Sequence, residues 1–191
     1  MGPLTHLTVL LAAVYPALVA AQQPRIASIS YSGNGCPRDP KFSGDLNDPT
    51  LTFNNFAASY PGTNQTLNCE AHIQTTGGSG WQLALKDNYV KSHVVLSPGT
   101  CLDFYTTVFY SASAAKTATA KGRLSNKAGA STIDQTVTLH NTVSPVWSPC
   151  SDSSGSIGIL NINFRGALTG DGSKAYFEAL SENLDFEWKQ C

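Results

Sequence analysis

Residues 184–189 read LDFEWK, and this stretch decides the fold class. Its apolar side chains, Leu184, Phe186 and Trp188, alternate with charged ones, which is the period-two pattern of a half-buried β-strand. The same alternation recurs at 81–86, 136–140 and 160–165. The stretch 102–110, LDFYTTVFY, is apolar on both faces, which predicts a strand that is covered on both sides.

Turn-forming residues separate these strands along the whole chain. They occur at 32–35, 47–49, 61–62, 77–80, 97–99, 153–155 and 170–172. The alanine-rich stretch 111–120 has no 3.6-residue period, so we interpret it as a loop that runs into an edge strand. About nine or ten short strands without crossover helices predict an all-β fold, an antiparallel β-sandwich or jelly roll.

The composition limits the domain count and the partners. A chain of 191 residues is long enough for one domain with a sizeable core. Its 12 Lys and Arg residues against 13 Asp and Glu residues leave a net charge of -1, so the chain lacks the basic field that nucleic-acid binding requires. We therefore expect no nucleic-acid partner.

The first 21 residues have the composition of a secretory signal peptide. An apolar run ends in Val19 and Ala21, which meet the small-residue requirement at the −3 and −1 positions of a signal-peptidase site. Pro16 interrupts the run, which barely reaches the ~20 residues that a membrane span needs. Residues 1–21 are thus predicted to be a signal peptide and 22–191 a single secreted β-sandwich domain, with no membrane segment after cleavage.

Cysteine and asparagine residues agree with an oxidising, extracellular destination. The five cysteines are widely separated and form no C-x-x-C motif. Two disulfides and one spare thiol are the simplest count, with about 15 possible arrangements. A sequon at residues 64–66 predicts a glycan on Asn64.

A set of short motifs extends over the mature chain. They are GCP at 35–37, NC at 68–69, VWSPC at 146–150, LNIN at 160–163 and EWKQC at 187–191. Together they resemble a family of small secreted proteins that is widespread in filamentous fungi, has some bacterial members and is known only as a domain of unknown function. The resemblance brings no catalytic or binding residues with it. The plant-associated fungi among its members suggest, by analogy alone, an effector-like or cell-surface role.

The resemblance also implies how the cysteines are used. The four cysteines of the family pattern correspond to Cys36, Cys69, Cys150 and Cys191. This implies that Cys101 is the free thiol or the site of an intermolecular bridge. Cys150 precedes the strand at 160–165, and Cys191 ends the strand at 184–189. If these strands are antiparallel neighbours, Cys150–Cys191 is favoured and Cys36–Cys69 is the other bond.

Possible metal and catalytic groups have simpler interpretations. Glu70 and His72 share a strand face, but two ligands do not make a metal site. Asp and Asn residues at 45–48, and Asp at 171, could bind calcium, yet turn formation explains them. We predict no metal and no cofactor.

A pair of carboxylates in the last strand raises the question of catalysis. Asp185 and Glu187 lie at i and i+2, roughly 6 to 7 Å apart, as in glycosidase acid pairs. Lys189 continues the same face, however, and alternating charge on a strand protects against edge pairing. A non-catalytic protein is therefore the favoured interpretation.

Two sets of side chains are candidates for ligand binding. If the last two long strands are neighbours, the row Asn161, Asn163 and Arg165 lies beside Asp185 and Glu187, and such groups suit hydroxyl-rich ligands. The alternative is a solvated face with cross-strand pairing of Arg165.

Aromatic residues form the second set. Tyr105 and Phe109 share one strand face and could stack on sugar rings, unless they face the second sheet or pack beneath a loop.

The prediction for function is a secreted, non-catalytic binding protein of the fungal extracellular space. Its expected partner is a cell-wall glycan or a host extracellular protein, and the sequence does not determine the oligomeric state. Two alternatives stay open: a polysaccharide-active hydrolase and a passive cell-wall structural protein.

Overall fold

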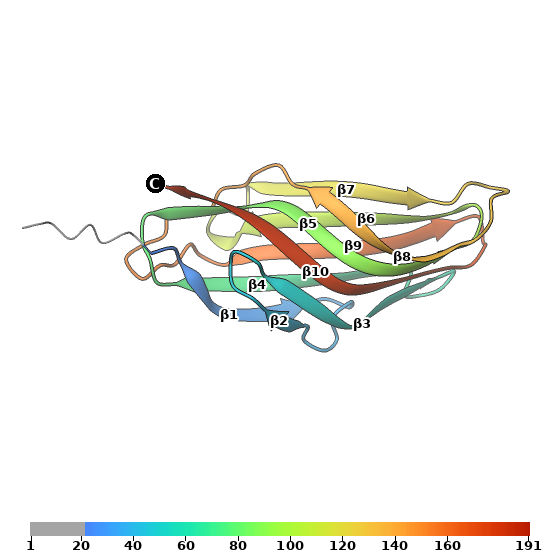
Figure 1. The fold of residues 1–191 in the computed structure, drawn as a ribbon, viewed down its shortest axis with the longest axis horizontal. Helices are drawn as coiled ribbons and strands as arrows, with labels where there is room; N and C mark the ends of the chain where they lie inside the picture. Colours follow the sequence, from blue (N-terminus) through green and yellow to red (C-terminus); the bar gives the residue numbers. More distant parts are fainter. Residues whose placement is uncertain (1–21) are drawn as a thin grey trace, which may run out of the picture.

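The computed structural model describes residues 22–191, which consist mostly of β-strands (Figure 1). The strands are β1 (Arg25–Ser32), β2 (Lys41–Ser43), β3 (Thr50–Tyr60), β4 (Thr66–Thr76), β5 (Trp81–Leu96), β6 (Thr100–Tyr110), β7 (Thr117–Ser125), β8 (Ile133–Thr142), β9 (Leu160–Gly170) and β10 (Ala175–Gln190). A 3-10 turn, η1 (Ser111–Ser113), precedes β7, so the interpretation of 111–120 as a loop leading into an edge strand is confirmed. The predicted signal peptide lies outside the described residues.

The strands form two five-stranded antiparallel sheets. Sheet A has the order β1-β4-β9-β6-β7 and sheet B the order β2-β3-β10-β5-β8. Strands β3 to β10 alternate between the sheets except for β6 and β7, which are neighbours in sheet A. The strands β3-β10-β5-β8 thus face β4-β9-β6-β7, which is the strand order of a jelly roll. The predicted fold class is confirmed. Within residues 22–191, no helix has the length and apolarity to cross a membrane.

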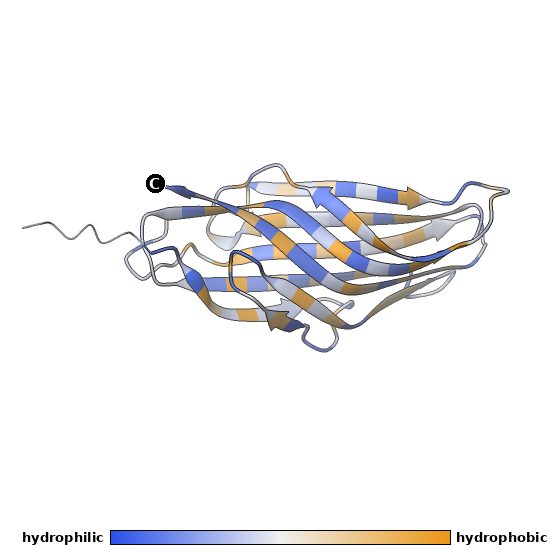
Figure 2. Cartoon of the chain, viewed as in Figure 1, coloured by the Kyte–Doolittle hydropathy of each residue, from blue (hydrophilic) through white to orange (hydrophobic). Residues whose placement is uncertain are grey.

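The hydrophobic core lies between the sheets. Apolar and polar residues alternate along most strands (Figure 2), and the apolar ones point into the sandwich. They form two clusters. One is centred on Phe56, Phe164 and Phe177, and the other contains Leu83 and Tyr110.

A layer of buried polar side chains separates the two clusters. Its members are Asn88, Thr106, Asn141 and Glu182. Asn88 Nδ2 donates to Glu182 Oε1 at 2.7 Å and to Thr106 Oγ1 at 2.9 Å, and Asn141 Nδ2 donates to Thr106 Oγ1 at 3.1 Å. Glu182 is only 3% exposed, and burial raises its pKa to about 7. The core therefore contains an ionisable group that is hard to charge.

Both predicted disulfides are present, Cys36–Cys69 and Cys150–Cys191. The reasoning behind the second was wrong, because β9 and β10 belong to different sheets. The segment before β9 runs along the start of β5 instead: Ser151 N donates to Trp81 O at 2.8 Å, while Cys191 N donates to Gly80 O at 2.9 Å. The start of β5 thus brings the two half-cystines together.

Cys101 is a free thiol on β6 and is half-buried. Non-reducing peptide mapping after alkylation of the native protein is expected to recover the two bonds above and to find the alkyl group on Cys101. Because Cys101 is only partly exposed, this labelling is expected to be slow but to proceed without denaturant. A peptide that links Cys101 to Cys150 or Cys191 would contradict the assignment.

Candidate functional site

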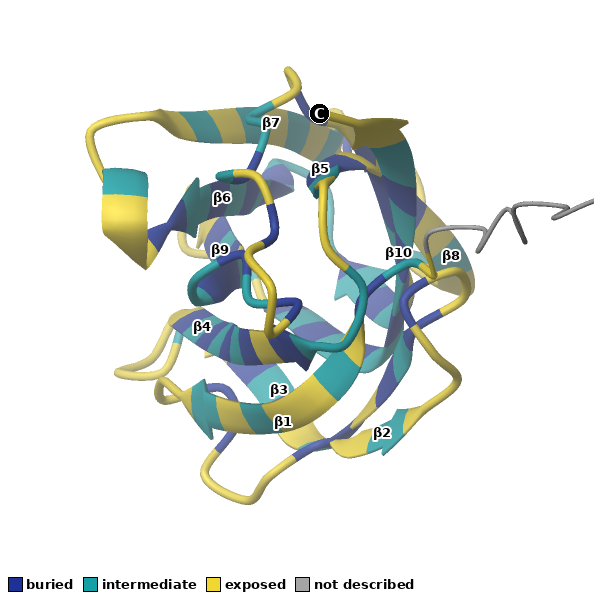
Figure 3. Ribbon diagram, turned by 90° about the vertical axis from the view of Figure 1, so that its left-hand side faces the viewer, coloured by how far each residue is buried: buried dark blue, intermediate teal, exposed yellow. Residues whose placement is uncertain are grey.

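The predicted polar row across the last two strands does not form. β9 lies in sheet A, between β4 and β6, whereas β10 lies in sheet B, between β3 and β5. The outer faces of the two sheets point away from each other (Figure 3), so Asp185 and Glu187 lie on the opposite side of the molecule from Asn163 and Arg165. The prediction was wrong because consecutive long strands need not be hydrogen-bonded neighbours in a sandwich.

Two separately predicted sets instead meet on one surface. Arg165 of β9 is paired with Tyr105 of β6, and Asn161 is paired with Phe109. These side chains point outward because the alternate residues, such as Phe164 and Val108, are buried in the core. The prediction that β6 is covered on both faces was therefore wrong.

We call this surface the sheet A face. It comprises the outward residues of β4, β9, β6 and β7. From one end to the other its rows are His72, Asn161, Phe109 and Thr117; Glu70, Asn163, Thr107 and Thr119; Asn68, Arg165, Tyr105 and Lys121; and Thr66, Ala167, Asp103 and Arg123. Residues in one row lie close enough to interact across the strands.

The end of this face at Asn161 is closed. Asn161 is 3% exposed, and its amide nitrogen donates to Ser111 Oγ at 3.0 Å. Its Oδ1 lies 2.7 Å from His72 Nδ1, and His72 Nε2 lies 2.9 Å from Ser32 Oγ. A neutral imidazole with its hydrogen on Nδ1 satisfies both contacts. Asn161 is thus a structural residue, and the expectation that it is exposed for binding was wrong.

The middle of the face is open and built around Tyr105. Arg165 Cζ lies 4.1 Å from the centroid of the Tyr105 ring, and Lys121 Nζ lies 5.2 Å from it. Arg165 and Lys121 are exposed, while Tyr105 is half-buried. A guanidinium over an aromatic ring is attracted to it electrostatically, so Arg165 is held in place. Beside it, Asn163 Nδ2 donates to Glu70 Oε2 at 3.0 Å.

Asp103 and Arg123 form an ion pair at the other end. Arg123 Nε and Nη2 donate to the two carboxylate oxygens of Asp103 at 2.7 and 2.6 Å. Lys121 Nζ lies 3.5 Å from Asp103 Oδ1. The hydrogen bonds from Arg123 lower the pKa of Asp103. Asp103 is therefore charged and fully partnered.

Sequence reasoning did not select Asp103, Lys121 or Arg123. The only signal was the alternation of 121–123, KGR, on an edge strand. A Cβ on Gly122 would clash with the Phe104 ring, so the glycine leaves room for that ring against β7 on the inner face of the sheet.

On the outer face of sheet B, some carboxylates are already paired with neighbouring side chains. Asp185 Oδ2 lies 3.3 Å from Lys86 Nζ, and Asp87 accepts hydrogen bonds from Thr142 and from His140 Nε2, at 2.7 and 2.8 Å. The predicted carboxylate pair of 185 and 187 thus includes one member that is already partnered.

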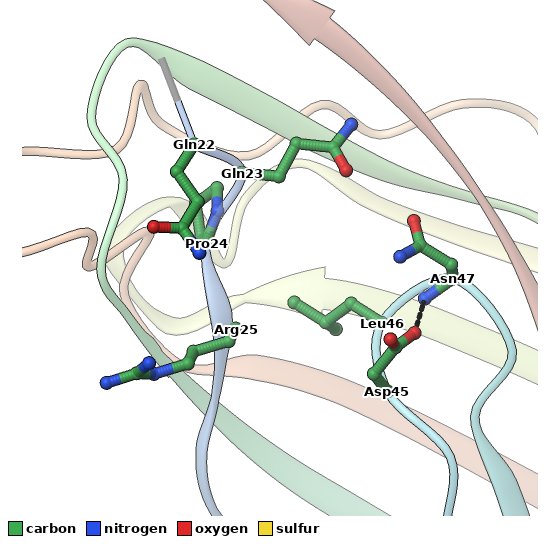
Figure 4. A pocket seen from close by; sticks show the side chains of 7 residues that line it. All are labelled: Gln22, Gln23, Pro24, Arg25, Asp45, Leu46 and Asn47. Carbon is green, nitrogen blue, oxygen red and sulfur yellow. Dashed lines mark hydrogen bonds between the residues drawn. The ribbon is translucent and has the colours of Figure 1, made fainter. Parts of the chain in front are cut away.

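The surface of residues 22–191 is also hollowed in places. A hollow of about 390 Å³ lies between the tyrosines 60 and 176 and is bordered by Lys174. Another, of about 260 Å³, lies between Gln22–Arg25 and the loop 45–47 (Figure 4). There, Asn47 N donates to Asp45 Oδ1 at 2.7 Å, which confirms that this loop carboxylate forms a turn. In residues 22–191, no group of three or more His, Cys, Asp or Glu side chains is arranged to hold a metal ion.

Fold and surface together define the class of protein: an all-β jelly-roll sandwich with two disulfides and a mixed aromatic and charged face on one sheet. The chain belongs to the family described as a domain of unknown function, DUF4360, whose sequence profile matches residues 22–191. The resemblance to a family known only as a domain of unknown function is therefore confirmed. None of the curated proteins compared with the chain matches it.

Proposed function

We propose that this protein is a non-catalytic binding protein of the extracellular space and that the sheet A face holds a polysaccharide. An extracellular setting is supported by the two disulfides, because such bonds persist mainly in oxidising compartments. The predicted signal peptide is a second, independent argument for secretion.

The observation that carries the proposal is the composition of the middle of the sheet A face. Tyr105 and Phe109 on β6 place two partly exposed aromatic rings next to the amide of Asn163 and the guanidinium of Arg165. Sugars present apolar ring faces and polar hydroxyl edges, which match aromatic rings and planar hydrogen-bonding groups respectively. Because β6 and β9 are interior strands of the sheet, the groups are held in fixed relative positions.

A double substitution tests this surface. Phe109→Ala combined with Asn163→Ala is expected to weaken binding to the preferred polysaccharide about tenfold or more, since both an apolar contact and an amide donor are removed. The measurement is a pull-down of the protein of residues 22–191 with insoluble polysaccharides and cell-wall fractions. Asn161 is left unchanged because its side chain is buried.

Tyr89→Ala is the matched control. Tyr89 is a partly exposed ring on the outer face of sheet B, stacked on His140 with ring centroids 4.5 Å apart. Its removal should leave binding unchanged. A folded double variant that binds like the native protein would exclude the sheet A face, and release of reducing sugar ends from the polysaccharide would contradict a non-catalytic role.

A further inference from the structure

The two outer faces of the sandwich differ in charge, although the chain as a whole is nearly neutral. The sheet A face carries three cations, Arg123, Arg165 and Lys121, against the two carboxylates of Asp103 and Glu70. The outer face of sheet B carries more carboxylates than cations. Its acids on β5, β8 and β10 are Asp87, Asp134, Glu178, Asp185 and Glu187, and its lysines on these strands are Lys86, Lys91 and Lys189. The excess charge is therefore positive on the sheet A face and negative on the opposite face.

Arg165 is the cation on the sheet A face that no carboxylate neutralises. Within residues 22–191, no Asp or Glu oxygen lies within 4.0 Å of its guanidinium. Its neighbours in the row are Asn68 and Tyr105, which are both uncharged. The nearby acids are engaged elsewhere: Asp103 by Arg123, and Glu70 by the amide of Asn163.

The position of Arg165 over Tyr105 prepares it for an anion. Stacking at 4.1 Å fixes the plane of the guanidinium while its N–H groups project from the edges of that plane. This fork matches a carboxylate or a sulfate group through two parallel hydrogen bonds. Because the side chain is already ordered, less conformational entropy is lost when a ligand binds.

Lys121 extends the cationic site across the strands. It lies on the β7 side of Tyr105, whereas Arg165 lies on the β9 side, and the two charged groups are 5.2 and 4.1 Å from the centroid of the Tyr105 ring. Lys121 makes only a loose contact with Asp103, at 3.5 Å between nitrogen and oxygen. A polymer lying across sheet A can therefore place one anionic group on Arg165 and another near Lys121.

We infer that the ligand of the sheet A face is an acidic polysaccharide, and that Arg165 binds its carboxylate or sulfate groups. The inference rests on the proposed function, because it names the ligand class for the same face. Neutral polysaccharides leave Arg165 without a charged partner, so they bind more weakly.

Polymers that differ in charge test the ligand class. Binding of the protein of residues 22–191 is measured by biolayer interferometry to polygalacturonate and to its fully methyl-esterified form, and to dextran sulfate and to dextran. At least one acidic polymer is expected to bind about tenfold more tightly than its neutral counterpart, with the advantage decreasing between about 0.05 and about 0.5 M NaCl through screening. The two acidic arms distinguish carboxylate from sulfate recognition.

Variants test the role of Arg165. Arg165→Gln is expected to lower affinity for the acidic polymer about tenfold or more, and Arg165→Lys, which keeps the charge but loses the planar fork, to have an intermediate affinity. Lys91→Gln is the matched control, because Lys91 is an exposed cation on the outer face of sheet B. Should Arg165→Gln fail to fold, Lys121→Gln on the edge strand β7 tests the same site. Its affinity for the acidic polymer is expected to fall about threefold or more, because one of the two cations beside Tyr105 is removed.

The outcomes separate the two proposals. Equal affinity for acidic and neutral polymers would overturn the acidic ligand class and leave polysaccharide binding by the sheet A face standing. Unchanged affinity of folded Arg165→Gln, or an equal loss in Lys91→Gln, would overturn the role of Arg165. Failure to bind any polysaccharide or wall fraction would overturn both proposals.

Discussion

Glu182→Gln is expected to raise the free energy of unfolding at pH 8 by about 3 kcal/mol and to leave it nearly unchanged at pH 4. Burial raises the pKa of Glu182 to about 7 from an ordinary value of 4.5. Below about pH 4.5 the carboxyl is protonated in both the folded and the unfolded protein, so the neutral amide replaces a neutral acid. Between pH 4.5 and about 7 the unfolded protein releases this proton while the folded protein must keep it, so stability is lost over that range, and the loss levels off above pH 7, where both states are ionised.

Chemical denaturation of both proteins at pH 4, 6 and 8 measures this difference. Other titrating groups are common to the two proteins, so their contributions cancel when the free energies are subtracted. The amide can accept the hydrogen bond that Asn88 Nδ2 now donates to Glu182 Oε1 at 2.7 Å. If the difference in unfolding free energy between the two proteins is the same at every pH, ionisation of Glu182 does not destabilise the folded protein, and the prediction is wrong.

Phe56→Ala is expected to lower the free energy of unfolding by about 3 to 5 kcal/mol, because it removes a large ring from the centre of one apolar cluster. Phe56 is fully buried, with ring centroids 5.2 Å from Phe53, 5.7 Å from Phe164 and 5.9 Å from Phe177. These neighbours belong to both sheets, so the cavity would lie where the sheets contact each other.

Phe109→Ala is the comparison for this loss. The Phe109 ring is partly exposed on the sheet A face, so its removal should cost about 1 kcal/mol or less. Urea denaturation of the two variants measures the contrast, and it also gives the stability cost of the Phe109→Ala change that the double variant of the binding experiment contains. Similar losses in the two variants would contradict the position of Phe56 at the centre of the core.

Some features of the candidate site were readable before the structure was known. Period-two alternation places Tyr105 with Phe109, and Asn163 with Arg165, on single strand faces, and this proved right for each strand. Extending the alternation of the last strand back from Leu184 also places Glu182 among inward residues. That burial could have been anticipated, although a charged residue is rarely expected in a core.

The sequence by itself determined that the protein is an antiparallel β-sandwich, and the motifs in it led to the cysteines that pair. Side-chain alternation is a local property of each strand, so it can be read from the chain. Tertiary structure alone decided which strands are neighbours: it separated β9 from β10, joined Arg165 to Tyr105 and brought Cys150 to Cys191 along β5. The physical reason is that backbone hydrogen bonds are nearly the same for every residue type, so strand order is set by packing of the whole core rather than by any one segment.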